Sequence, residues 1–173
     1  MNMRTYRVVP LSSRAGVVEW VDATTPFGVW LTGAYKSLRH KSFSPSDALD
    51  LAKAENEKRA GTAGRLATFR KILRQLPPVF RYFAFRHFHL PSDWYEARLR
   101  YTRSTAVASV LGYILGIGDR HSYNILLDKQ NGEVIHIDLG IAFDMGKLLS
   151  VPELVPFRLT QNVVDGKLLM TLR

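Results

Sequence analysis

Continuous apolar runs in the second half of the chain predict a helix that leads into a small β-hairpin. The apolar run Val107–Ile117 comes first, and the short strand-like run Ile125–Leu127 follows. Asn131-Gly132 comes next, and Glu133–Ile137 has the composition of a second strand. Asn-Gly between two apolar runs is a strong hairpin signal. The hairpin would bring the residue before the first strand close to the residue after the second.

The first half of the chain predicts another hairpin, followed by helices. Residues 3–11 and 17–21 are rich in β-favouring side chains and are separated by a polar turn. A short helix is expected over residues 26–31. A second helix is expected to start at Ser44-Pro45, because proline suits the first helical position.

The middle of the chain predicts two further helices around an aromatic segment. We expect Gly61–Gly64 to interrupt the helical pattern that starts at Ser44-Pro45. Apolar residues then recur at three- and four-residue steps from Leu66 to Leu76, as in an amphipathic helix. The aromatic residues of segment 79–88 are expected in the core. The longest helix should run from Pro91 to about Leu115, capped by Ser92 or Asp93. Its apolar end should be buried, because a helix that is apolar all round is buried.

Polar side chains that suit phosphoryl transfer flank the second hairpin. Asn124 and Asp138 offer the oxygen ligands that Mg²⁺ prefers. Asp119 lies in the loop before the first strand, where it could orient an attacking hydroxyl and accept its proton. His121 could share that work or stabilise developing charge. A single Asp-x-x-x-x-Asn spacing is common, but the hairpin and the Asp-Leu-Gly after it add weight.

These motifs resemble those of a known superfamily. Asp119-Arg120-His121-x-x-Asn124 together with His136–Gly140 is similar to the phosphatidylinositol-3-kinase-like superfamily. The runs at residues 78–83 and 155–166 resemble the ATM-type DNA-damage kinases, named for ataxia-telangiectasia mutated and its fungal telomere-maintenance counterpart. The resemblance extends from about Thr5 to Gly166.

The resemblance implies an α/β fold of the α+β kind. It is a mainly helical, protein-kinase-like C-lobe with a small catalytic hairpin and an N-terminal hairpin left from the N-lobe. Residues 1–21 would be the last N-lobe strands and the start of the hinge. Residues 22–166 would be the C-lobe, with a catalytic loop (116–124), a metal-binding Asp-Leu-Gly (138–140) and an activation segment (141–160). Residues 167–173 form a tail that does not resemble the family.

The resemblance also implies how ATP would be held. Trp20 would be the wall against which the adenine packs, and Val21 would supply backbone contacts at the hinge. The alternative for Trp20 is an ordinary core aromatic residue. The metal would be Mg²⁺ or Mn²⁺, on Asn124 and Asp138.

The implied activity is ATP-dependent phosphorylation of protein Ser or Thr, expected before Gln, in the DNA-damage response and telomere maintenance. The expected location is the nucleus, and the expected partners are the remainder of the parent kinase and DNA-damage sensor proteins. Phosphoinositide kinases usually carry a basic cluster in the activation segment, whereas residues 141–154 here have Lys147 alone against Asp144 and Glu153. A lipid kinase fragment is therefore an alternative that we do not favour.

Several parts of a complete kinase are absent from the sequence. There is no Gly-x-Gly-x-x-Gly loop, and the lysine and glutamate that act on the phosphates precede the hinge in the family. We interpret the chain as a truncated kinase and expect almost no turnover from it alone. A degenerate, non-catalytic interaction module is the other alternative.

Composition and charge bear on where the protein acts and what it binds. The chain has 173 residues, 46% of them hydrophobic, and no cysteine. It lacks an apolar run near the ~20 residues of a membrane span and an N-terminal signal-like segment, so we expect a soluble intracellular protein without a membrane partner. The net charge is +9, and residues 36–103 carry all of the excess. We attribute that excess to solvated helical faces and do not expect direct nucleic-acid binding.

Overall fold

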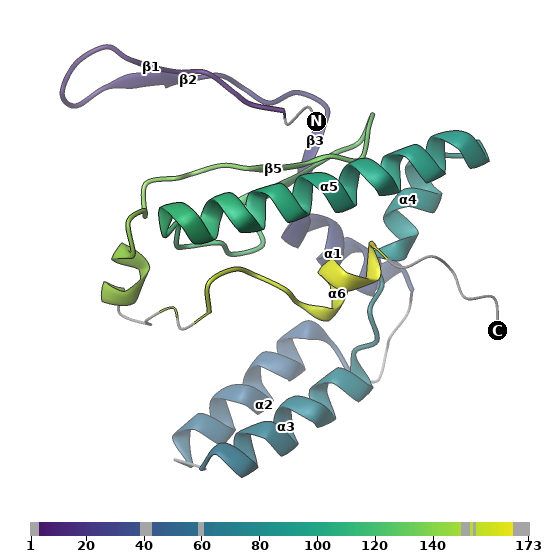
Figure 1. Ribbon diagram of the computed structural model, residues 1–173. Coiled ribbons are helices and arrows are strands. Elements are labelled where there is room, and N and C mark those ends of the chain that lie inside the picture. Colours follow the sequence, from purple (N-terminus) through teal and green to yellow (C-terminus); the bar gives the residue numbers. More distant parts are fainter. Residues whose placement is uncertain (1–3, 39–42, 59–60, 150–152, 154, 168–173) are drawn as a thin grey trace.

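Helices form most of the molecule, and α1 and α5 contact one small sheet (Figure 1). The computed structural model describes residues 4–38, 43–58, 61–149, 153 and 155–167. The helices are α1 (Phe27–Ser37), α2 (Pro45–Glu57), α3 (Thr62–Gln75), α4 (Arg81–His87), α5 (Pro91–Leu115) and α6 (Gln161–Asp165), with a 3₁₀ turn η1 (Met145–Leu148). The strands are β1 (Val8–Pro10), β2 (Gly16–Val18), β3 (Thr24–Pro26), β4 (Ile125–Asp128) and β5 (Val134–His136). The expected mainly helical α+β class is confirmed.

The central sheet has the strand order β3-β4-β5, and both pairs are antiparallel. Ile125 pairs with His136 across β4 and β5, so the predicted hairpin is present. Its connection is a five-residue loop rather than a two-residue turn. The Asp128 carboxylate organises this loop by accepting hydrogen bonds from the backbone N–H groups of Gln130 and Asn131, at 2.8 and 3.1 Å.

The N-terminal hairpin is formed by β1 and β2 alone, which make a separate two-stranded sheet. Figure 1 shows it projecting away from the helical body. The predicted hairpin is therefore confirmed, although its strands are shorter than residues 3–11 and 17–21, and Met3 lies outside the described residues. All residues of both strands are exposed.

The core lies between α1, α4, α5 and the central sheet. Phe80 lies at its centre, with ring centroids 4.9 Å from Phe27, 5.4 Å from Trp30 and 5.0 Å from Tyr101. The aromatic segment 79–88 thus contributes to the core as predicted, except that Tyr82 and Phe85 are exposed. The edge-to-face pairs that Phe80 makes with Phe27 and Trp30 add to the stabilisation from burial alone.

Helix α6 is fastened to this core by polar contacts. The Asn162 carboxamide accepts from the backbone N–H of Val79 and donates to the Tyr35 hydroxyl, at 2.8 and 3.0 Å. The buried Asp165 carboxylate accepts from the backbone N–H and the Nε of Arg81, both at 2.8 Å. Helix α6 therefore fixes the start of α4 although the two are about eighty residues apart in sequence.

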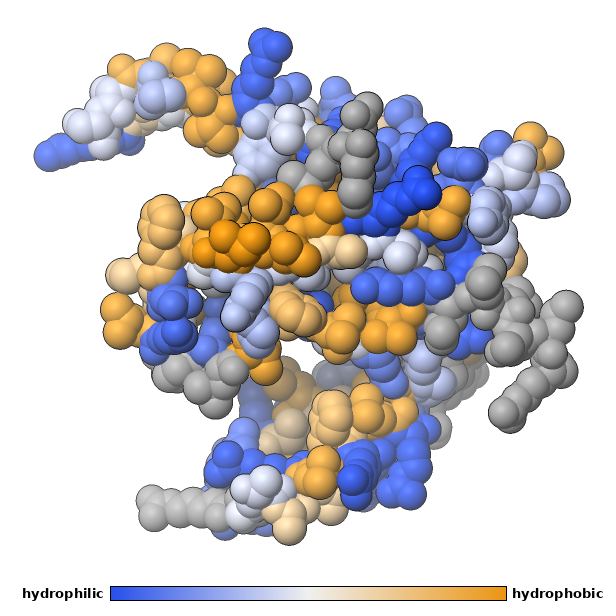
Figure 2. Space-filling view, viewed as in Figure 1, coloured by the Kyte–Doolittle hydropathy of each residue, from blue (hydrophilic) through white to orange (hydrophobic). Residues whose placement is uncertain are grey.

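Helix α5 has the predicted bounds, but two predictions about it are wrong. Its N-cap is Leu90, without a side-chain cap, rather than Ser92 or Asp93. Its apolar C-terminal end is largely exposed, with Ile114 68% exposed, and Figure 2 shows a hydrophobic patch over it. An apolar helix face is buried only where another element packs on it, and no described element covers this part of α5.

Helices α2 and α3 form a helical hairpin to one side of the body (Figure 1). Ser44 caps α2 through a reciprocal capping box with Asp47, as the Ser44-Pro45 signal indicated. The expected interruption at 61–64 is wrong beyond Gly61, because α3 begins at Thr62. Likewise α1 continues to Ser37, past the predicted end at 31. Among the described helices, none is long and apolar enough to cross a membrane.

Candidate active site

The loop between α5 and β4 starts at a sharp turn. Gly116 ends α5 in the left-handed region with φ 57°, and a Cβ there would lie 2.5 Å from the backbone nitrogen of Asp144. Glycine is therefore required both by conformation and by close approach. Because α5 ends here, the chain turns, and Gly118 and Asp119 lie in the loop at the edge of the central sheet, before β4.

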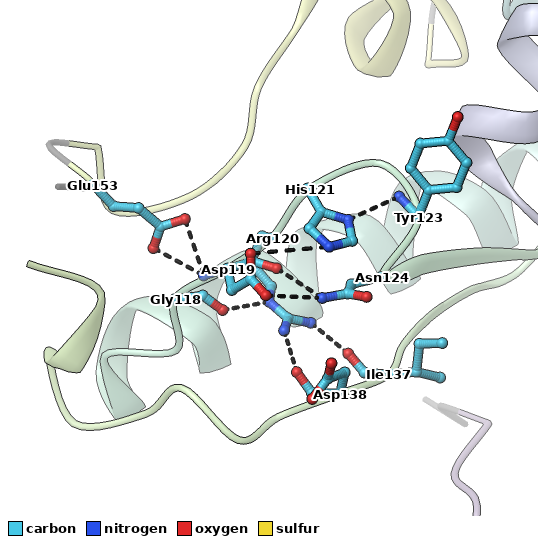
Figure 3. Close-up of polar contacts among 9 residues, drawn as sticks. All are labelled: Gly118, Asp119, Arg120, His121, Tyr123, Asn124, Ile137, Asp138 and Glu153. Atoms are coloured by element: carbon cyan, nitrogen blue, oxygen red, sulfur yellow. Dashed lines mark hydrogen bonds and ion pairs between the residues drawn. The ribbon is translucent and has the colours of Figure 1, made fainter. Parts of the chain in front are cut away.

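Asp119 and Asn124 are held together at this edge (Figure 3). The Asn124 Nδ2 donates to the backbone oxygen of Asp119 at 3.0 Å and to its carboxylate at 3.3 Å. Asn124 is buried, whereas the Asp119 side chain is partly exposed. Asp119 itself has φ 56°, a conformation that costs on the order of 1–3 kcal/mol in a non-glycine residue and is frequent at functional sites.

Arg120 connects the loop to the end of β5. Its side chain is only 7% exposed. It donates from Nε to the oxygen of Gly118 and from one terminal nitrogen to the oxygen of Ile137, both at 2.8 Å, and its other terminal nitrogen donates to the backbone oxygen of Asp138. Burial lowers the pKa of Arg120, and the carboxylates of Asp119, Asp138 and Glu153 oppose that shift.

The two predicted metal ligands lie at neighbouring positions of the sheet edge. The backbone N–H of Ile137 donates to the oxygen of Asn124 at 3.0 Å, which places Asp138 one residue beyond that pair. In a regular strand Asp138 would point to the opposite face from its neighbour. Its backbone, with φ 54°, leaves the strand conformation at that residue. The Asp138 side chain is exposed rather than enclosed in a dry interior.

The chemistry of these two side chains fits Mg²⁺ or Mn²⁺. Because Nδ2 of Asn124 faces Asp119, its amide oxygen lies on the other side (Figure 3). One amide oxygen and one carboxylate make a sparse site, which suits a cation that takes its remaining ligands from phosphates and water. Among the described residues, no group of three or more His, Cys, Asp or Glu is placed to hold a metal.

The two histidines near the site differ in environment. His121 is exposed, with Nε2 3.9 Å from the Asp119 carboxylate and Nδ1 accepting from the backbone N–H of Tyr123 at 3.2 Å. It therefore lies beside the predicted base, as the sequence indicated. His136, on β5, is more enclosed: burial, together with Arg120, lowers its pKa to about 4.

A largely apolar cleft leads to this edge from the N-terminal hairpin. It has about 1310 Å³ of empty space, part of it open to solvent, and Asp138 is one of the residues that line it. Trp20 and Val21 both line it, together with residues of β2 and β4. Trp20 is 84% exposed, so the alternative that it is an ordinary core residue is wrong. The structure thus brings the predicted adenine-binding residues and Asp138 to one cleft.

Two residues in the site carried no role in the sequence analysis. Arg120 appeared only as part of the Asp-Arg-His motif, and Glu153 only as a charge in the activation segment. Both Glu153 oxygens lie 2.9 Å from the backbone nitrogen of Asp119. A lone arginine between two predicted catalytic residues was a usable signal for the first. The second depends on a contact across 34 residues, which no local pattern encodes.

The fold defines the class: it is kinase-like, mainly helical with small antiparallel sheets. A family model described as phosphatidylinositol 3- and 4-kinase matches residues 1–171, and the chain belongs to this family.

The curated relatives are Ser/Thr protein kinases. The chain is 50% identical over 166 residues to the serine/threonine-protein kinase tel1 of Schizosaccharomyces pombe, covering 96% of this chain and 6% of that protein. It is 48% identical over 167 residues to the serine-protein kinase ATM of Sus scrofa, covering 94% of this chain and 5% of that one. The resemblance to ATM-type kinases is therefore confirmed, and the chain spans a small part of the length of these relatives.

A solved structure has the same fold. The FAT and kinase domain of CtTel1 superposes with a TM-score of 0.86 at 46% identity, covering 95% of this chain and 12% of that one.

Proposed function

We propose that this chain forms the metal- and nucleotide-binding part of a Ser/Thr protein kinase, which transfers the terminal phosphoryl group of ATP to a protein hydroxyl. The observation that carries the proposal is the arrangement around Arg120. This buried side chain donates to the backbone oxygen of Gly118, just before Asp119, and to the backbone oxygen of Asp138. It thereby links the backbone at Asp119 to the backbone at Asp138, and Asp138 lines the apolar cleft.

Each site residue has a proposed part in the reaction. The Asp119 carboxylate would orient the attacking hydroxyl and accept its proton, and the hydrogen bond from Asn124 would keep that carboxylate in place. His121 would stabilise negative charge that develops beside Asp119. The Asn124 amide oxygen and the Asp138 carboxylate would hold Mg²⁺ or Mn²⁺. When bound, the cation would neutralise charge on the phosphates as a Lewis acid.

The nucleotide would enter from the side of the N-terminal hairpin. Trp20 would pack on the adenine, and the backbone of Val21 would offer the hydrogen bonds. The exposure of Trp20 supports this role, because an exposed large aromatic residue at a cleft is available to a ligand.

A protein hydroxyl is the acceptor that we favour over a lipid headgroup. Lys147 is already paired with Asp144 at 2.9 Å, and it is the one basic residue between positions 141 and 149, so this part of the segment offers little free positive charge for an inositol phosphate. The relatives are named serine and serine/threonine kinases. From the resemblance we extend the proposal to Ser or Thr before Gln, to DNA-damage signalling and telomere maintenance in the nucleus, and to DNA-damage sensors and the remainder of the kinase as partners.

We expect little turnover from the chain by itself. Its sequence has no Gly-rich loop, and loss of one electrostatic donor to a transition state costs about 3–4 kcal/mol in enzymes generally. Binding of nucleotide is the property that should remain.

The test is calorimetric titration of ATP with and without Mg²⁺. Asp138→Ala should abolish the Mg²⁺-dependent part of the affinity. Asp93→Ala, which removes an exposed carboxylate from α5, is the matched control and should bind as the unaltered chain does. Mg²⁺-dependent binding that survives in Asp138→Ala would contradict the proposal. A panel of Ser-Gln peptides and phosphoinositides then separates protein from lipid acceptors.

A further inference from the structure

The Gly118–Asp119 peptide unit is held on both sides by charged side chains. Its oxygen accepts from the Arg120 Nε at 2.8 Å. Its N–H donates to Glu153, whose two oxygens are each 2.9 Å from the nitrogen. Hydrogen bonds with one ionised partner are about twice as strong as neutral ones. This peptide unit therefore has a fixed orientation, and Figure 3 shows the side chains of Arg120 and Glu153 bonded to it.

The Glu153 carboxylate packs closely against two glycines. A Cβ added to Gly118 would lie 2.6 Å from a Glu153 oxygen, and one added to Gly146 would lie 2.5 Å from the same atom. The backbone N–H of Glu153 also donates to the oxygen of Gly146 at 3.1 Å. The carboxylate is thus received by a closely fitted backbone surface rather than by another side chain.

The rest of the activation segment approaches the same loop. Phe143 donates from its backbone N–H to Leu115, and Asp144 donates to Gly116, at 2.9 and 3.0 Å. In the opposite direction, the N–H of Gly118 donates to the oxygen of Ile141 at 2.8 Å. These are backbone contacts. Glu153 is the residue whose side chain extends this docking to the peptide unit of Asp119.

We infer that Glu153 is a positioning residue that couples docking of the activation segment to the orientation of Asp119. Asp119 lies in the left-handed region, which its own backbone does not favour, so an external contact is needed to hold its peptide unit. When the segment is docked, Glu153 keeps the Asp119 carboxylate turned to its place beside Asn124. When the segment leaves, the N–H loses its acceptor and the peptide unit is free to rotate. The catalytic meaning of this coupling rests on the proposed function of Asp119.

The inference is tested on the amide of Asp119 itself. Hydrogen exchange measured by ¹⁵N NMR should be about 10- to 100-fold faster at this amide in Glu153→Ala, as expected for loss of a hydrogen bond to a charged group. Glu153→Gln keeps one acceptor oxygen and should restore part of the protection. The Leu127 amide in β4 should exchange equally in all variants, which shows that the fold is intact.

The control is Glu96→Ala, which removes an exposed glutamate from α5 and should leave the Asp119 amide unchanged. An Asp119 amide that exchanges equally in the unaltered chain and in Glu153→Ala would overturn the inference, as would the absence of any rescue by Gln. Any turnover that the chain supports should fall about 10- to 100-fold in Glu153→Ala, with KM for ATP within about twofold. A parallel rise in KM would instead make Glu153 part of nucleotide binding and would also overturn it.

Titration of ATP with Mg²⁺ on the same samples separates this inference from the proposed function. If the unaltered chain binds no nucleotide but the Asp119 amide depends on Glu153, the proposed function fails and the structural coupling stands. If nucleotide binds as proposed and the amide does not depend on Glu153, only the coupling fails.

Discussion

The molecule contains two β-hairpins built from similar residues, and their surroundings differ completely. In the β4–β5 hairpin every residue of β4 is buried, and β5 contacts α5, where Ser104 accepts a hydrogen bond from the backbone N–H of Val134 at 2.9 Å. In the β1–β2 hairpin all residues are exposed, and no described element covers either face. The difference lies in what packs against each hairpin, since valine and other apolar residues are prominent in both.

This contrast suggests different roles for the two hairpins, one in the stability of the fold and one in ligand binding. The β4–β5 hairpin lies between α5 on one side and β3 on the other, so its apolar side chains stabilise the fold. The apolar side chains of the β1–β2 hairpin are free to line the cleft, as Val8 and Val18 do. We therefore expect substitutions in the β4–β5 hairpin to change the free energy of unfolding, and substitutions around the β1–β2 hairpin to change ligand affinity.

The largest effect is expected for Leu127→Ala in β4. Leu127 is 0% exposed, and truncation of a buried leucine costs about 2–5 kcal/mol through lost burial and the cavity left behind. Val18→Ala in β2, where the side chain is 61% exposed, should change the free energy of unfolding by less than about 0.5 kcal/mol. Urea denaturation measures both. Equal losses in the two variants would remove the distinction between the hairpins.

The next effect is the pH dependence of stability from His136 in β5. Its pKa is about 4 in the folded chain and about 6.5 in an unfolded one. As the pH falls below about 6.5 the unfolded state binds a proton that the folded state does not, so stability is lost until about pH 4. The loss is up to about 3 kcal/mol. His136→Gln should have a shallower stability profile in this window, whereas His89→Gln, at an exposed position, should keep it. Parallel profiles for His136→Gln and the unaltered chain would contradict this account.

A smaller effect is expected for Trp20→Ala, beside the β1–β2 hairpin. Loss of the aromatic wall should weaken binding of ATP with Mg²⁺ about 5- to 10-fold, or about 1–1.4 kcal/mol, without changing the unfolding free energy. Tyr95→Ala, at an exposed aromatic residue on α5, should change neither. Unfolding that shifts with Trp20→Ala while affinity does not would assign Trp20 to the fold.

The sequence predicted those features that local chemistry determines. The bounds of α5 were predictable because proline starts the helix and Gly116 ends it in the left-handed region. The β4–β5 hairpin was predictable from two apolar runs around Asn131-Gly132. The order of Asp119, Asn124 and Asp138 around that hairpin followed directly from these two elements.

Features that depend on distant partners were not predictable. The exposure of the apolar end of α5 depends on what packs there, and the pattern of the helix itself does not contain that information. The contact of Glu153 with Asp119 spans 34 residues. Similarly, the left-handed backbone of Asp138 changes where its side chain points, and simple strand alternation gave no indication of it.

The account depends most on Asn124 and Asp138 holding one cation. A crystal structure of the chain with Mg²⁺ and a non-hydrolysable ATP analogue tests this directly. We expect the cation about 2.1 Å from the Asn124 amide oxygen and from an Asp138 carboxylate oxygen, with the adenine beside Trp20. A cation bound elsewhere, or one that touches neither of these side chains, would contradict the account.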